Sequence, residues 1–135
     1  MILCDTGVIV AVINSSDKHH LRCVSALSGM KQRLITTQAC ITESIYLIRS
    51  HSGWPGQQTL INWIEVGFLN IHPSNPIGEK RACSLMRLYA DAPMDFADAT
   101  LVVAAEELGI VRILTIDAHF YTYRINDKSH FEVLP

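Results

Sequence analysis

The sequence PMDFADATLVVAAEELGIVRILTIDAHF carries three aspartates where a buried helix and strand should be apolar. Asp95 and Asp98 are three residues apart, so a helix presents them on one face. The rest of this predicted helix is apolar around most of its circumference, which indicates burial on nearly all sides. Asp117 follows the apolar segment 111–116, which is typical of an inner parallel strand. It therefore falls at a strand's carboxyl end, where open α/β sheets bind ligands.

Asp5 repeats this arrangement near the start of the chain. It follows a short apolar strand and precedes an apolar helix over 8–13, for which Thr6 is the expected cap. Glu43 stands alone as an acid in the apolar helix predicted over 38–51. Because crossover connections bring successive strand ends to one sheet edge, these acids are expected to converge on one crevice. The predicted group is Asp5, Glu43, Asp95, Asp98 and Asp117.

Carboxylates that share a crevice repel each other and resist ionisation unless a cation lies between them. An all-oxygen ligand set suits Mg²⁺ or Mn²⁺ better than Zn²⁺. Such a site suits phosphodiester hydrolysis, in which the metal orients and deprotonates water and offsets charge on the phosphate. The sequence leaves open whether one or two metals bind.

Each acid also has a purely structural interpretation. Asp95 is a good helix N-cap, and Asp98 suits the first turn of a helix for its dipole. Asp5 and Asp117 are residues that start turns after strands, and Glu43 is compatible with a surface position. These alternatives stay open for single residues, whereas all five together favour a site.

Two threonines stand beside the strand-end aspartates. Thr6 and Thr115 are candidates to bond a carboxylate or a metal-bound water, although Thr6 fits equally well as a plain cap. The adjacent pair His19 and His20 is a weaker metal candidate, because neighbouring side chains diverge on a helix.

Strands alternate with helices along the chain, which predicts an α/β fold with a short parallel sheet covered by helices on both faces. The 135 residues, 49% of them hydrophobic, are expected to form one domain over 1–135. A helix that ends near Gly29, with Ser15, Ser16 and Asp17 as candidate caps at its start, should bury Leu21, Val24 and Leu27. The remaining elements are expected as strands at 2–4, 34–36, 68–72 and 131–134 and helices at 57–66 and 77–90.

Composition narrows the cellular setting. The apolar run 7–13 is too short to span a bilayer and has no basic segment before it, so we expect a soluble cytoplasmic protein without a membrane partner. Four cysteines without metal-ligand spacing are expected to be reduced and buried. They are Cys4, Cys23, Cys40 and Cys83.

A net charge of −2 gives no general attraction to nucleic acid, so any nucleic-acid partner needs a local site. Basic residues on the outer sides of two predicted helices are the candidates for substrate binding. They are Lys18, Arg22, Lys80, Arg81 and Arg87.

The series CDTGVIVAVI, TTQACITESIYLI, PMDFADATLVVAA and LTIDAHF resembles the PIN domain, in the form found in VapC-type toxins of toxin–antitoxin pairs. The resemblance implies a three-layer α/β/α sandwich with Mg²⁺- or Mn²⁺-dependent endoribonuclease activity. It further implies a homodimer and an antitoxin that blocks the site. By position, the family's acidic quartet falls on Asp5, Glu43, Asp98 and Asp117, with metal binding at all but Glu43 and small hydroxyls at Thr6 and Thr115. Asp95 is additional to this quartet.

Two other functions compete with a metal-dependent nuclease. The first is a non-catalytic PIN-like module that binds RNA or protein, against which the complete quartet argues, because a binding module need not keep mutually repelling acids. The second is a phosphatase with Asp5 as nucleophile, but the position two residues later is Gly7 instead of the expected acid.

Overall fold

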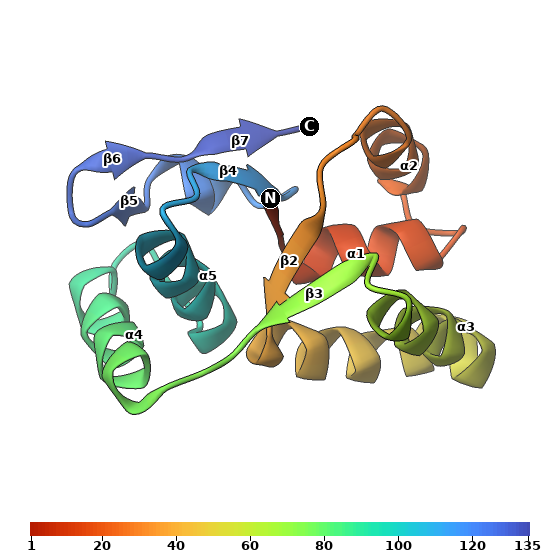
Figure 1. Cartoon of the computed structure of the whole chain (residues 1–135), viewed down its shortest axis with the longest axis horizontal. Coiled ribbons are helices and arrows are strands. Elements are labelled where there is room, and N and C mark those ends of the chain that lie inside the picture. Colours follow the sequence, from red (N-terminus) through yellow and green to blue (C-terminus); the bar gives the residue numbers. More distant parts are fainter.

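Five short strands form the middle layer of the computed structural model, which describes all of residues 1–135 (Figure 1). They are parallel throughout and lie in the order β3–β2–β1–β4–β7. Parallel strands need crossover helices, and these cover both faces of the sheet. The strands are β1 (Ile2–Cys4), β2 (Leu34–Thr37), β3 (Leu69–His72), β4 (Arg112–Leu114) and β7 (Glu132–Leu134).

Each face of the sheet has its own hydrophobic core, because alternate strand residues point to opposite sides. Leu3 and Ile113 pack with α4 and α5, whereas Ile2 and Leu114 pack with α1, α2 and α3. The predicted three-layer α/β/α arrangement is therefore confirmed. The helices are α1 (Thr6–Ile13), α2 (His20–Ser28), α3 (Gln38–Glu65), α4 (Pro76–Leu88) and α5 (Phe96–Leu108). None combines the length and hydropathy of a membrane span.

Helix α3 joins two segments that the sequence predicts as separate helices. Gly53 has φ 61° and ψ −159°, a conformation outside the helical region, and Pro55 follows it. Glycine adopts this positive φ without steric cost, so the chain kinks here and continues as a helix. The expected break is thus a kink within one element.

The helix expected to end near Gly29 is shorter than predicted. Asp17 does not cap it, since its carboxylate accepts from the His19 amide in the turn before α2. Leu21 is 79% exposed and Cys23 is the one fully buried residue of α2, so the predicted burial of Leu21 is wrong. The side of α2 that packs against the core contains Cys23, Ala26 and Leu27, so of the predicted apolar face only Leu27 lies at its centre. Cys83 is also exposed, contrary to expectation, while the other three cysteines are buried and all four are free.

Two elements near the end of the chain were not expected from the sequence. A 3₁₀ helix, η1, covers Ala118–Tyr121, and a small antiparallel hairpin pairs β5 (Arg124–Ile125) with β6 (Ser129–His130). Asn126 and Asp127 both have positive φ in the three-residue turn between these strands, a conformation that Asn and Asp adopt more readily than most residues. These strands of two residues are too short for a pattern of alternating polarity to reveal them.

Candidate active site

Three aspartates from distant parts of the chain meet at the carboxyl edge of the sheet. Asp5 follows β1, Asp117 lies just beyond the neighbouring strand β4, and Asp98 lies in the first turn of α5. One carboxylate oxygen from each lies within 4.8 Å of the others. The topology therefore produces the convergence that the strand ends predict for these three residues.

Asp5 is held at both carboxylate oxygens. Its Oδ1 accepts from the Thr6 amide at 2.7 Å, and its Oδ2 accepts from the Thr115 hydroxyl at 2.7 Å. Asp5 is thus the N-cap of α1, and the expectation that Thr6 caps this helix is wrong. The Thr6 hydroxyl instead donates to the Cys40 carbonyl at 3.4 Å. Aspartate and threonine are both good N-cap residues, so the sequence alone does not decide which of these two neighbours caps α1.

Asp98 belongs to a capping box at the start of α5. The Asp98 amide donates to Asp95 Oδ1 at 2.9 Å, and the Asp95 amide donates to Asp98 Oδ2 at 3.4 Å. Gly109 ends the helix in the left-handed conformation with φ 68°. Asp95 is therefore the cap of α5 and lies outside the group of three carboxylates.

Asp117 is fixed by residues close in sequence. Its amide donates to the Thr115 hydroxyl at 3.0 Å, so Thr115 links Asp117 to Asp5. Asp117 Oδ1 accepts from the His119 amide at 2.9 Å and lies 2.8 Å from His119 Nδ1. These contacts orient the carboxylate toward the other two acids.

Tyr123 is a further contributor that sequence reasoning missed. This fully buried tyrosine donates to the Pro93 carbonyl at 2.9 Å and lies 3.3 Å from Asp98 Oδ2. Its ring stacks on His119 with centroids 6.3 Å apart, so one aromatic pair supports two of the carboxylates. His119 was detectable by its nearness to Asp117, whereas the contact from Tyr123 to Asp98 spans 25 residues and leaves no local signal.

Glu43 is half-buried on α3 and does not belong to the group within 4.8 Å. Its negative charge is nevertheless among the influences that raise the pKa of Asp5. Glu43 thus lies at the margin of the cluster, and its predicted catalytic role stays a prediction.

Burial leaves two of the carboxylates difficult to ionise. Desolvation, opposed by the bond from Thr115, raises the pKa of Asp5 to about 6. Desolvation and the charges of Asp95 and Asp5 raise the pKa of Asp98 to about 7. No lysine or arginine forms an ion pair with the cluster, and His119 is the one basic partner. A cation that binds oxygen ligands would relieve this repulsion, so the donor set fits a divalent metal such as Mg²⁺ or Mn²⁺.

The basic residues expected to bind substrate do not form one patch. Lys18 and Arg22 lie in or before α2, whereas Lys80 and Arg87 lie on α4, which covers the opposite face of the sheet (Figure 1). Arg81 makes a bidentate ion pair with Glu106 at 2.9 Å and a third bond to Asp127. It ties α4 to α5 and the β5–β6 hairpin.

A parallel α/β/α sandwich with acidic side chains at the carboxyl edge of its sheet defines a class of proteins suited to bind metal and phosphate at that edge. The family model described as "PIN domain" matches residues 2–126, and the chain belongs to this family.

Individual relatives are distant in sequence. The chain is 22% identical over 134 residues to Ribonuclease VapC26 of Mycobacterium tuberculosis, covering 98% of this chain and 99% of that protein. The crystal structure of M. tuberculosis VapC20, a sarcin-ricin loop cleaving toxin, matches with a TM-score of 0.85 at 17% identity over the full length of both chains.

Two further solved structures share the fold more loosely. A toxin–antitoxin complex from Klebsiella pneumoniae matches with a TM-score of 0.64 at 14% identity over 87% of each chain. FitAcB from Neisseria gonorrhoeae matches with a TM-score of 0.62 at 17% identity over 98% of this chain and 97% of that one. At these identities the likeness concerns the fold.

Proposed function

We propose that this protein is a metal-dependent endoribonuclease and the toxin of a type II toxin–antitoxin pair. The observation that carries the proposal is the group of three carboxylates within 4.8 Å, two of them buried with raised pKa values. Keeping such acids together is costly for folding, and a bound cation offsets that cost. Membership of the PIN family and the relative named Ribonuclease VapC26 support RNA as the substrate.

Asp5, Asp98 and Asp117 would hold the metal, with Mg²⁺ and Mn²⁺ as candidates because every donor is an oxygen. Bound there, the metal would supply positive charge against the phosphate and favour deprotonation of the attacking water. The Thr115 hydroxyl donates to Asp5 and accepts from the Asp117 amide, so it fixes these two aspartates relative to each other. The Tyr123 hydroxyl contacts the Asp98 carboxylate. Glu43 is proposed as the fourth acid, acting at the margin of the cluster on water or substrate.

A cognate antitoxin, a homodimer and a cytoplasmic location complete the proposal. The structural neighbour from Klebsiella pneumoniae is itself a toxin–antitoxin complex, which supports a protein partner for this chain. The partner is expected to cover the acidic crevice and thereby block cleavage. Residues 1–135 are proposed to act as one nuclease domain.

Cleavage of RNA by the purified protein tests the function. We expect endonucleolytic cuts in single-stranded or loop RNA that stop in excess EDTA and return with Mg²⁺ or Mn²⁺, because the ligand set is all oxygen. Asp117→Asn should abolish cleavage at every metal concentration. A non-catalytic binding module would retain RNA without cutting it, and undiminished cleavage in EDTA would rule out the metal mechanism.

A further inference from the structure

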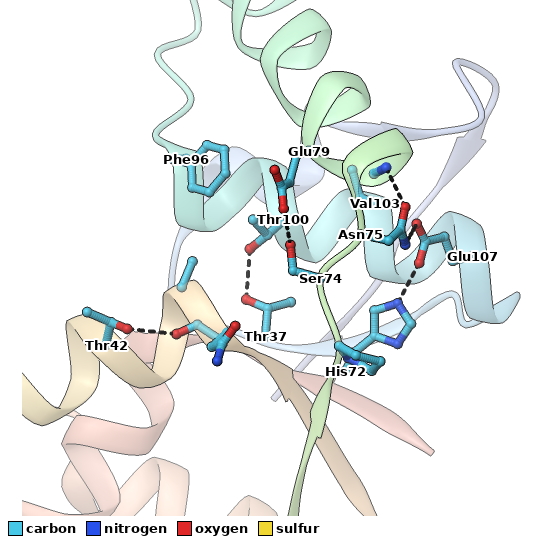
Figure 2. A pocket seen from close by; sticks show the side chains of 14 residues that line it. Thr37, Thr42, His72, Ser74, Asn75, Glu79, Phe96, Thr100, Val103 and Glu107 are labelled. Carbon is cyan, nitrogen blue, oxygen red and sulfur yellow. Dashed lines mark hydrogen bonds and ion pairs between the residues drawn. The ribbon is translucent and has the colours of Figure 1, made fainter.

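A pocket of about 270 Å³ lies along the same carboxyl edge of the sheet (Figure 2). Thr37 at the end of β2 and His72 at the end of β3 line it from the sheet. Helices α3, α4 and α5 and the loop 73–75 between β3 and α4 supply the remaining walls. None of the lining residues belongs to the site described above, so the pocket has no assigned role.

The pocket and the carboxylate cluster share helix α5. Phe96 and Thr100 line the pocket from α5, on either side of Asp98 in the sequence. Residues two positions apart on a helix point about 160° away from each other, so Phe96 and Thr100 face the pocket from the side of α5 opposite Asp98. The Thr37 and Thr100 hydroxyls, which both line the pocket, are hydrogen-bonded at 2.7 Å and join β2 to α5. Because β1 pairs with β2, the strand end at Asp5 lies next to the strand end at Thr37, which lines the pocket. A nucleic-acid strand that follows this edge of the sheet can therefore contact both sites.

The pocket lining is negatively charged, so it disfavours a phosphate group and favours a ligand that donates hydrogen bonds. Its lining contains two carboxylates, Glu79 and Glu107, and neither lysine nor arginine. Glu107 is engaged by His72 at 2.6 Å and by Asn75 at 3.0 Å. Glu79 accepts at Oε1 from the Ser74 hydroxyl, and its Oε2 has no protein donor. One carboxylate oxygen is thus left to accept an N–H from a ligand.

Phe96 supplies an aromatic surface beside this acceptor (Figure 2). The three residues that follow it in the first turn of α5 are buried, yet Phe96 is 42% exposed. Exposed aromatic rings next to a nucleic-acid site stack on unpaired bases, which bind through their faces and are read along their edges.

The walls of the pocket are held in place without a ligand. Glu107 on α5 bonds His72 of β3 and Asn75, which caps α4 by accepting from the Gly78 amide at 2.8 Å. A Cβ at Gly78 would lie 2.7 Å from Glu107 Oε1, so glycine allows α4 to begin this close to α5. A preformed pocket lowers the entropy lost on binding.

We propose that this pocket binds a guanine base next to the scissile phosphate of the RNA, with Phe96 stacking on the base and Glu79 accepting its N–H groups. Guanine presents two neighbouring N–H donors on its Watson–Crick edge, which Glu79 can accept at its free Oε2 and at the second lone pair of Oε1, beside the bond from Ser74. Adenine and cytosine place an acceptor beside their amino group, and uracil flanks its single N–H with two carbonyls, so a carboxylate disfavours all three. This assignment rests on the proposed ribonuclease function.

A binding experiment tests the pocket independently of cleavage. The ¹⁵N-labelled full chain is titrated in Mg²⁺ with GMP, AMP, CMP, UMP and ribose 5-phosphate, which contain no internal phosphodiester to cut. We expect GMP to shift the amide signals of Phe96, Glu79 and Thr42 at the lowest concentration, and ribose 5-phosphate to leave them unchanged. Equal shifts from all five compounds would overturn base recognition. Shifts from arginine amide but not from GMP would assign the pocket to a protein partner instead.

Matched variants separate the pocket from general effects. Phe96→Ala should weaken GMP binding about tenfold, within the range for loss of one base–aromatic stack. Phe68→Ala is the control, because Phe68 is also 42% exposed and does not line the pocket. Glu79→Gln should remove the preference for GMP over AMP, whereas Glu65→Gln on α3 should not. GMP affinity that is unchanged in Phe96→Ala would contradict the proposal.

Sequencing of the RNA ends after digestion of a random-sequence pool distinguishes failure of the pocket from failure of the function. Wild-type protein should show guanine enriched at one position beside the cut, and Phe96→Ala and Glu79→Gln should still cut but with this enrichment lost. Cutting by both variants with the wild-type enrichment would reject the guanine pocket and leave the ribonuclease intact. Absence of cutting by wild type would reject the ribonuclease, while the titration still decides whether the pocket binds guanine.

Discussion

At the scale of single residues, the cluster depends on groups that hold the carboxylates in place as well as on the carboxylates. The Tyr123 hydroxyl is a buried example, because it bridges Asp98 and the Pro93 carbonyl. Burial and the neighbouring carboxylates raise the pKa of Tyr123, so the hydroxyl stays protonated and able to donate. Residues that orient metal ligands in this way contribute to metal affinity without touching the metal.

Tyr123→Phe tests that role. We expect Mn²⁺ affinity to fall about tenfold, with a loss of stability of about 1 kcal/mol from the lost hydrogen bonds. Tyr89→Phe is the control, because the Tyr89 hydroxyl accepts from the Arg124 amide and has no contact with the cluster. Calorimetric titration with Mn²⁺ measures both variants. Equal Mn²⁺ affinity in wild type and Tyr123→Phe would make Tyr123 a packing residue only.

At the scale of elements, the first turn of α5 serves both folding and the site. The capping box explains why two acids three residues apart open a buried helix. The Asp95 carboxylate accepts from the Asp98 amide at the start of the helix. The Asp98 carboxylate accepts from the Asp95 amide and also belongs to the group of three carboxylates. The negative charge of Asp95 also raises the pKa of Asp98.

Two substitutions of Asp95 separate capping from charge. Asp95→Asn keeps a good cap and removes the charge, so stability should change little and Mn²⁺ should bind at least as tightly near pH 6.5, since Asp98 loses its proton more readily. Asp95→Ala should cost about 1 kcal/mol of stability through the lost cap. Thermal melts and Mn²⁺ titrations of both variants check this. If Asp95→Asn abolished Mn²⁺ binding, Asp95 would be a metal ligand.

How far the sequence predicts these elements depends on the length of each pattern. Local signals of a few residues predict the strand end at Asp5 and the helix cap at Asp95, and the structure has both there. The strand predicted over 111–116 is shorter, because β4 ends at Leu114 and Asp117 lies three residues beyond it. Leu21 was misplaced because nine residues of α2 give too little periodicity to fix its buried face. The contact of Tyr123 with Asp98 was out of reach, because it depends on how η1 packs against α5.

At the scale of the whole molecule, stability is linked to the ionisation of the cluster. In the folded state the pKa of Asp5 is raised to about 6 and that of Asp98 to about 7, from a usual value of 3.8. Between pH 4 and pH 7 the folded protein therefore binds more protons than the unfolded chain, and the free energy of unfolding falls as pH rises.

The contribution of Asp5 and Asp98 to the stability of the metal-free protein should accordingly fall as the pH rises from about 4 to about 7. Added Mn²⁺ should counter the loss, because a cation that binds only the folded, deprotonated cluster stabilises it by mass action. Denaturant unfolding at several pH values, in EDTA and in Mn²⁺, measures both trends. In Asp98→Asn the fall should be shallower, and an unchanged slope would show that Asp98 does not titrate in this range.

Four melting curves and one cleavage assay, on wild type and Asp98→Asn with and without Mn²⁺, test the central claim that these carboxylates bind the metal of a nuclease. At 4.8 Å two carboxylates repel by roughly 3 kcal/mol at an effective dielectric near 20, as an upper figure. At pH 8 without metal, Asp98→Asn should therefore be as stable as wild type or more so, because the amide keeps one acceptor oxygen and removes the charge. Wild type should gain stability with Mn²⁺ and cut RNA, whereas the variant should gain little and cut nothing. A variant that is destabilised equally in both conditions and still cuts RNA would contradict the account.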